Sequence, residues 1–212
     1  MIKMDWTSIY LKTSSLKVFI LGAGEVATRR ANKFLDHGAN VKIIGNHLPK
    51  TLKDRGVKSY PKECADELVK WADLVIVASG NKKLSEYVSK IAKNKLINRA
   101  DYPKKGNIIV PTSFNIGNIE ISIFTKGKSP LMAKQIRKKI QAVITEEDIL
   151  EIELQDYSRV KLKKYIKNQK QRREYLYEIF KNEKINNYIK NRQTDDAKKY
   201  IDNLIKGIIS DS

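Results

Sequence analysis

Two glycines near the start of the chain have the spacing of a phosphate-binding loop. The segment Gly22-Ala23-Gly24-Glu25-Val26-Ala27 follows a β-branched run and opens a helical pattern, as in the G-x-G-x-x-G/A fingerprint. Gly22 would permit the tight turn, Gly24 would let a pyrophosphate approach the backbone, and the helix N-terminus would offer N–H donors. A purely structural turn is the alternative. We predict a dinucleotide site that includes Gly22, Gly24, Glu25 and Val26.

Polar residues at two later strand ends would complete this site. The acidic residue expected about 20 positions after the glycines, where it would bind a ribose, is missing, and Gly45-Asn46-His47 stands there. We predict that Asn46, His47 and Ser79 contact the coenzyme, although each segment also fits an ordinary turn. NAD is the expected coenzyme; without a carboxylate to repel a 2′-phosphate, NADP stays open.

The elements that position these residues alternate between strand and helix, which predicts a parallel sheet with crossover helices. We expect strands at 17–21, 40–44, 73–78 and 96–98, and helices at 25–37 and 82–93. Further strands are expected at 7–11, 107–111 and 119–125, then a helix from Ser129 to about residue 143. The predicted fold is α/β: a Rossmann-type doubly wound parallel sheet (1–111), a small β/α dimerisation segment (112–146) and an all-helical C-terminal domain (147–212).

The composition indicates an anionic partner without identifying it. Lys and Arg number 42 against 24 Asp and Glu, a formal net charge of +18, although a generally Lys-rich surface explains this equally well. The lone Cys64 and two separated histidines predict no metal site and fit a reducing compartment. Without an apolar leader or a run of roughly 18 apolar residues, we expect a cytoplasmic protein with no membrane partner.

Five sequence blocks together resemble the precorrin-2 dehydrogenases, including the dehydrogenase module of siroheme synthase. The first three, at 18–30, 38–44 and 73–79, indicate only a Rossmann domain. The specific blocks are Asn98-Arg99-Ala100-Asp101 and the stretch 121–140, whose Gly-x-Ser-Pro-x-x-Ala helix start matches in register. Two departures stand out: Lys126 replaces the first of two usual glycines, and Ser79-Gly80-Asn81 replaces Thr-Asp-Asp.

The resemblance implies NAD-dependent oxidation of precorrin-2 to sirohydrochlorin, with Asp101 as the catalytic carboxylate. It also implies a polycarboxylate tetrapyrrole substrate, for which we predict Lys126, Lys128 and Ser129 as contacts, and a homodimer. Metal insertion into sirohydrochlorin stays open. The basic stretch 157–173 leaves a second class, a non-catalytic nucleotide-sensing module with an anionic partner. Because no recognition motif accompanies that stretch, we do not expect nucleic acid as a partner.

Overall fold

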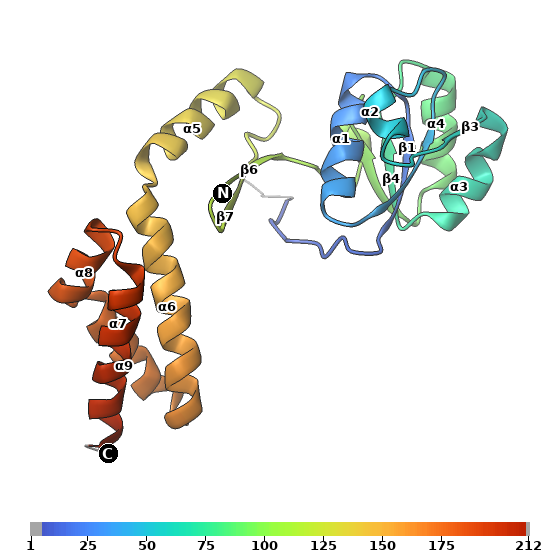
Figure 1. Ribbon diagram of the computed structural model, residues 1–212. Coiled ribbons are helices and arrows are strands. Elements are labelled where there is room, and N and C mark those ends of the chain that lie inside the picture. Colours follow the sequence, from blue (N-terminus) through green and yellow to red (C-terminus); the bar gives the residue numbers. More distant parts are fainter. Residues whose placement is uncertain (1–5, 211–212) are drawn as a thin grey trace, which may run out of the picture. The chain divides into compact units, whose positions relative to one another are not determined.

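The structure is a computed structural model that describes residues 6–210. The chain divides into two compact units, Met1–Val110 and Pro111–Ser212. Each unit has its own hydrophobic core. The first contains the predicted Rossmann-type sheet, and the second contains a β-hairpin followed by helices (Figure 1).

The first unit is built on a five-stranded sheet in which every pair of neighbours is parallel. Its strands lie in the order β3-β2-β1-β4-β5. Their bounds are β1 Lys17–Leu21, β2 Asn40–Ile44, β3 Ser59–Tyr60, β4 Leu74–Val77 and β5 Leu96–Arg99. The chain reverses its direction across the sheet between β1 and β4, and such a switch point opens a ligand crevice at the carboxyl ends of the strands. The predicted fold class is therefore confirmed.

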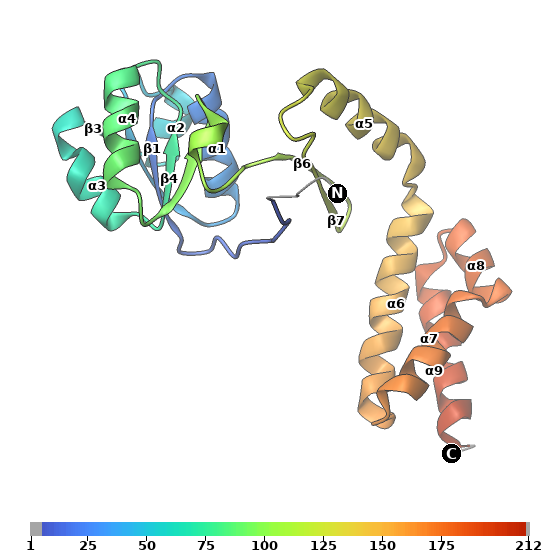
Figure 2. The same cartoon turned by 180° about the vertical axis from the view of Figure 1, so that it is seen from behind.

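Helices cover both faces of this sheet, which explains why the buried residues of its central strands β1 and β4 are all apolar. Alternate residues of β1 point to opposite faces: Val18 and Ile20 pack with α1 (Glu25–Asp36), and Phe19 and Leu21 pack on the other side. The remaining helices are α2 (Lys50–Lys53) on the α1 face and α3 (Ala65–Trp71) and α4 (Lys82–Ile91) on the opposite face (Figure 2). Two short 3₁₀ helices, η1 (Lys62–Cys64) and η2 (Pro103–Lys105), lie in loops.

Two of the predicted strands are wrong. Residues 7–11 form no strand, and Ile9 is 77% exposed, so no burial favours one there. Residues 107–111 also form no strand, because the amide N–H groups of Asn107 and Ile108 both donate to the carbonyl of Ile97 instead of alternating along a ladder. The short elements α2, β3, η1, α3 and η2 and the strand at residues 112–116 were not predicted, since each contributes only a few buried residues to a pattern.

The second unit begins with an antiparallel hairpin of β6 (Thr112–Ile116) and β7 (Ile119–Ile123). Its two-residue turn requires Gly117, which has a φ of +51° and whose hypothetical Cβ would lie 2.7 Å from Cγ2 of Ile149. The next element is α5 (Pro130–Val143), which starts as predicted, with the Ser129 side chain accepting a hydrogen bond from the Met132 amide.

Four further helices complete the second unit, as the helical periodicity predicts. They are α6 (Glu146–Tyr165), α7 (Gln169–Phe180), α8 (Glu183–Lys190) and α9 (Thr194–Ser210). Side chains such as Leu154, Leu162 and Ile201 form their common core. None of the helices within residues 6–210 has the length and apolar character needed to cross a membrane. The three-part division at 111 and 146 stays a prediction.

Candidate active site

The glycine loop follows β1 and lies against the end of β4. Gly22 has a φ of +119°, and a Cβ there would lie 2.2 Å from the carbonyl oxygen of Ala78. Only glycine therefore allows β1 and β4 to end this close together. Gly24 differs, because its backbone is extended (φ −73°, ψ −177°) and no atom lies within 4 Å of a Cβ built on it. The space above Gly24 is open.

The start of α1 has the features that a pyrophosphate requires. Gly24 is the N-cap residue of this 12-residue helix, and no described side chain makes a capping hydrogen bond there. The first amide groups are thus available to an anion at the positive end of the helix dipole. Glu25 is exposed and forms a 3.7 Å surface ion pair with Arg29, and Val26 is 38% exposed. These residues fit the phosphate groups of a dinucleotide.

The loop after β2 contacts the glycine loop directly. A Cβ on Gly45 would lie 2.5 Å from Cβ of Ala23, so the two loops touch. The hydroxyl of Ser59 donates to the Gly45 carbonyl at 2.6 Å and holds the loop on its other side. Asn46 and His47 follow Gly45 and are exposed. The structure therefore brings the second predicted segment to the same edge of the sheet as the first.

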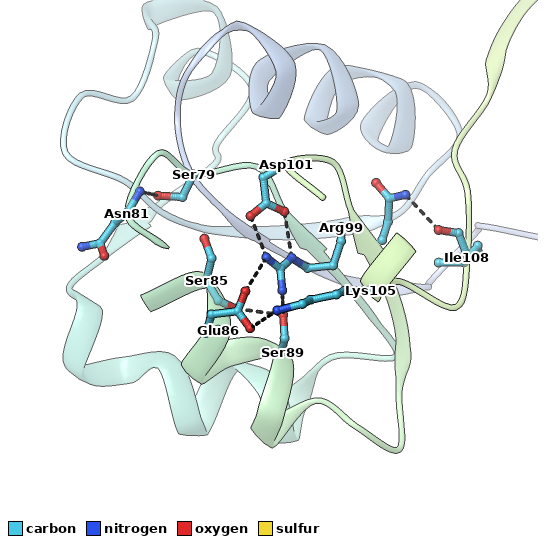
Figure 3. Close-up of polar contacts among 10 residues, drawn as sticks. Ser79, Asn81, Ser85, Glu86, Ser89, Arg99, Asp101, Lys105 and Ile108 are labelled. Carbon is cyan, nitrogen blue, oxygen red and sulfur yellow. Dashed lines mark hydrogen bonds and ion pairs between the residues drawn. The ribbon is translucent and has the colours of Figure 1, made fainter. Parts of the chain in front are cut away.

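Ser79 lies in the loop after β4, beside Gly22. Its Oγ accepts a hydrogen bond from the amide of Asn81 at 3.1 Å (Figure 3). The Asn81 side chain in turn caps α4 by accepting a hydrogen bond from the amide of Leu84. Ser79 thus shapes the strand-to-helix turn, while its hydroxyl hydrogen stays available for a second partner. A role of Ser79 in the turn is therefore compatible with a contact between its hydroxyl and the coenzyme.

Asp101 lies just past the end of β5, at the same carboxyl edge. Its carboxylate forms two parallel hydrogen bonds with Arg99: Nε donates to Oδ1 and Nη2 to Oδ2, both at 2.8 Å (Figure 3). The Arg99 side chain is only 2% exposed, whereas the Asp101 side chain is 24% exposed. The Asp101 carboxylate is therefore partly exposed, and the buried guanidinium of Arg99 binds it.

The charge of Asp101 is set by two opposing effects. Burial alone would raise the pKa of its carboxyl group, but the hydrogen bonds and positive charge of Arg99 outweigh burial, and the pKa is lowered. Backbone amides of Asp101 and Tyr102 act in the same direction as Arg99. The carboxylate is thus fully ionised at neutral pH, as a proton acceptor requires.

Two residues of this cluster were not predicted as neighbours of Asp101. Glu86 and Ser89, both on α4, accept hydrogen bonds from Arg99 at 3.1 and 2.8 Å, and Lys105 donates to Glu86 at 2.9 Å. The hydrogen bond from Lys105, followed by that from Arg99, lowers the pKa of Glu86. The sequence pattern does not link α4 to Arg99, because their proximity depends on how α4 packs on the sheet.

Asn98 is a second buried polar residue beside this cluster. It is 2% exposed, and its Nδ2 donates to the carbonyl of Ile108 at 2.9 Å. This bond ties the segment after η2 to β5. Together with Asp101, Asn98 forms the two polar ends of the Asn-x-x-Asp element, but the structure shows different roles for them: Asn98 holds a loop, and Asp101 reaches the edge of the sheet.

The remaining predicted residues belong to the second unit and form the turn before α5. Lys126 and Gly127 both have positive φ, +54° and +73°, and the amide of Lys128 donates to the carbonyl of Thr125 at 3.0 Å. Such a turn favours glycine at both central positions. Lys126 therefore adopts a strained backbone where a glycine would be relaxed. Lys126 and Lys128 are exposed, and Ser129 caps α5.

The described residues contain no group of three or more His, Cys, Asp or Glu side chains arranged to hold a metal ion. The polar groups of the candidate site in the first unit include the Ser79 hydroxyl, backbone amides and the Asp101–Arg99 pair.

The sheet order and the glycine loop define a dinucleotide-binding protein of the Rossmann type. Comparison with known families agrees: residues 9–112 match a family described as "Putative NAD(P)-binding".

Relatives of the whole chain are more specific. A protein of Methanocaldococcus jannaschii named "Putative precorrin-2 dehydrogenase" is 31% identical over 86% of this chain and 93% of its own length. The precorrin-2 dehydrogenase of Methanosarcina barkeri is 29% identical over 85% of each chain. A siroheme synthase of Mannheimia succiniciproducens is 26% identical over 94% of this chain but only 43% of its own length. The chain therefore belongs to the precorrin-2 dehydrogenase family.

A solved structure supports the fold over nearly the whole chain. The structure of SirC, a precorrin-2 dehydrogenase, superposes with a TM-score of 0.76 at 22% sequence identity, and the match covers 95% of this chain and 100% of SirC. The hairpin and the helical region after the Rossmann unit thus belong to the shared architecture.

Proposed function

We propose that the protein oxidises precorrin-2 to sirohydrochlorin with NAD as the hydride acceptor. One hydride passes to NAD⁺ and one proton leaves to a base, so the products are sirohydrochlorin, NADH and a proton. The observation that carries the proposal is that an ionised, partly exposed Asp101 lies at the same sheet edge as a glycine loop fitted to a pyrophosphate, in a chain of this family. The cytoplasm, where NAD is supplied, is the proposed location.

The residues of the chain have separate tasks in this proposal. The amides after Gly24 and the segments at Asn46, His47 and Ser79 orient the coenzyme, whose nicotinamide supplies the hydride-accepting carbon when bound. Asp101 accepts the proton that leaves the macrocycle. Because its pKa is lowered, Asp101 stays ionised well below neutral pH, and we expect the rate to fall only in the acid range in which this carboxylate protonates.

A direct assay tests this function. The purified chain is incubated with precorrin-2 and NAD, and sirohydrochlorin is followed by its absorption; a parallel reaction contains NADP. We expect product formation that depends on the coenzyme, with NAD preferred. Binding of NAD without any turnover would instead favour the nucleotide-sensing alternative.

The turn before α5 is the proposed contact for the substrate carboxylates. Lys126 and Lys128 are exposed in the turn that leads into the N-terminus of a 14-residue helix, where anions are favoured. Lys126 retains a left-handed backbone that glycine would adopt without strain, which supports a role for its side chain.

Replacing Lys126 with glycine separates this role from folding. Removing the backbone strain, which costs roughly 1 to 2 kcal/mol, should offset the greater entropy of glycine in the unfolded chain, so the free energy of unfolding is expected to stay equal or rise slightly. The KM for precorrin-2 should rise about 2- to 5-fold with an unchanged kcat, as expected for one exposed ion pair. Lys163→Ala on the exposed surface of α6, outside residues 112–146, is the control. An unchanged KM in Lys126→Gly would remove Lys126 from the site.

We further propose that the chain forms a homodimer through residues 112–146. Within the hairpin strands only Phe114 is buried, and within α5 only Ala133. A two-stranded hairpin is marginal by itself, and its edges invite pairing with another chain. Leu131 is 66% exposed, as an interface residue would be in an isolated chain.

Light scattering of the full chain tests the dimer at micromolar concentration. We expect a mass of twice 24.4 kDa for the parent and a shift toward the monomer for Leu131→Asp. Val160→Asp makes the same chemical change at an exposed position of α6 outside the segment and should leave the mass unchanged. A monomeric parent contradicts the proposal.

A further inference from the structure

The guanidinium of Arg99 is fixed in place by four hydrogen bonds. Beyond the two bonds to Asp101, Nη1 donates to the Ser89 hydroxyl at 2.8 Å and Nη2 donates to Glu86 at 3.1 Å. Each of its three nitrogens therefore has an acceptor, and the side chain is 2% exposed. Because these hydrogen bonds fix the planar guanidinium, the guanidinium in turn fixes the plane of the carboxylate that it binds.

The support for Arg99 comes from two other elements. Ser89 on α4 donates its own hydroxyl hydrogen to the Ser85 carbonyl at 2.8 Å, and so presents its oxygen to Arg99. Glu86, also on α4, is bound by Lys105 of η2 at 2.9 Å (Figure 3). Two cations and two anions thus balance one another, and Asp101 is the member of this network that lies at the edge of the sheet.

We propose that Arg99 is a positioning residue of the active site, which holds the Asp101 carboxylate in one orientation and in its ionised form. This inference rests on the proposed function in one respect, because Asp101 is taken as the proton acceptor. Arg99 binds both carboxylate oxygens, and the Asp101 side chain is 24% exposed, so a substrate proton can still reach the carboxylate from the solvent side.

Arg99 is proposed to affect both the orientation and the charge of the Asp101 carboxylate. These two effects predict different experimental results, so they can be measured separately. Without Arg99, burial of Asp101 is no longer outweighed and its pKa should rise, so the acid limb of the kcat/KM profile should move to higher pH. At a pH above the titration of Asp101 in both the parent and the variant, the carboxylate is ionised with or without Arg99. A loss of kcat at such a pH therefore reports the lost orientation.

The first measurement is an NMR titration of the full chain labelled with ¹³C in its aspartate carboxyl groups. Asp101→Asn identifies the signal of Asp101 by its disappearance. We expect Asp101 to titrate at higher pH in Arg99→Met than in the parent, and at an intermediate pH in Arg99→Lys, because an ammonium supplies charge without the fork. Lys90→Met, which removes an exposed cation from α4 outside the network, should titrate like the parent.

The second measurement is the pH profile of dehydrogenation with NAD affinity determined in parallel. In Arg99→Met, kcat at a pH above the titration of Asp101 should fall about 10- to 100-fold with an unchanged Kd for NAD. Compared with Arg99→Met, Arg99→Lys should bring the pH at which Asp101 titrates closer to that of the parent, but should restore kcat less. If Arg99→Met does not fold, Arg99→Lys alone decides, since a parent-like kcat there excludes a need for the fork.

Two results would overturn the inference: an Asp101 signal that titrates identically with and without Arg99, or a parent-like kcat in Arg99→Met. Failure of the proposed function is a different result, namely no dehydrogenation by the parent chain. In that case the NMR titration still decides whether Arg99 holds the charge of Asp101.

Discussion

Replacing Asp101 with asparagine is expected to lower kcat for precorrin-2 oxidation about 10²- to 10⁴-fold, the usual loss when a general base is removed. Asparagine keeps the shape of the side chain but cannot accept a proton. Arg99 retains Glu86 as an anionic partner, so the buried guanidinium is not left without a counter-charge. We therefore expect a folded chain that binds NAD with the affinity of the parent.

A matched substitution and the pH dependence sharpen this test. Asp66→Asn removes another carboxylate of the same unit, one that accepts the hydroxyl of Tyr87, and should leave kcat unchanged. In the parent, the lowered pKa of Asp101 means that its ion pair stabilises the folded state fully above the unfolded pKa, and that this stabilisation is lost as the pH falls through the folded pKa. Asp101→Asn should lack that part of the acid dependence. If Asp101→Asn has a kcat close to that of the parent, Asp101 is only a turn residue and not the proton acceptor.

Replacing Gly24 with valine is expected to abolish NAD binding without unfolding the chain. The φ of −73° at Gly24 suits any residue, and no atom lies within 4 Å of a Cβ there, so the fold accepts the side chain. The same side chain fills the open space above the first amides of α1, where the pyrophosphate must approach. Calorimetry with NAD should detect no binding, while the circular dichroism and melting temperature stay close to those of the parent.

Replacing Gly22 is expected to have the opposite effect, namely to destabilise the fold. The two glycine variants together therefore distinguish a structural role from a role in coenzyme binding. Its φ of +119° and the 2.2 Å approach of a Cβ to the Ala78 carbonyl leave no room for a side chain. Gly22→Ala should therefore destabilise the fold by at least about 1 to 2 kcal/mol, the usual penalty of a positive φ, before the steric clash is added. Unchanged NAD affinity in a folded Gly24→Val chain would contradict the proposed coenzyme site.

The central sheet could be predicted from the sequence because its strands are short apolar runs bounded by turn residues. Strands β1 and β2 begin and end where the pattern predicts, and the helices α1, α4 and α5 are predicted to within two residues at each end. The failures at 7–11 and 107–111 have a common physical cause. Their apolar residues fit a strand locally, but a strand needs a neighbour that pairs with it, and composition does not reveal one.

The candidate site was predictable only in part, for a related reason. Gly22, Gly24 and Ser79 were predicted because they follow strands, and the carboxyl ends of parallel strands meet at one edge. The contacts of Arg99 with Glu86 and Ser89 on α4 depend on how α4 packs on the sheet. The strain at Lys126 likewise follows from a turn geometry that the sequence suggests only through a missing glycine.

The most direct test of the central claim is the stoichiometry of a single reaction. The purified chain is mixed with precorrin-2 and NAD, and the absorptions of NADH and sirohydrochlorin are recorded together; Asp101→Asn and Gly24→Val serve as controls. The proposed function predicts that NADH and sirohydrochlorin appear in equal amounts at equal rates with the parent chain and nearly vanish with both variants. Saturable binding of NAD to the parent without formation of either product would contradict it.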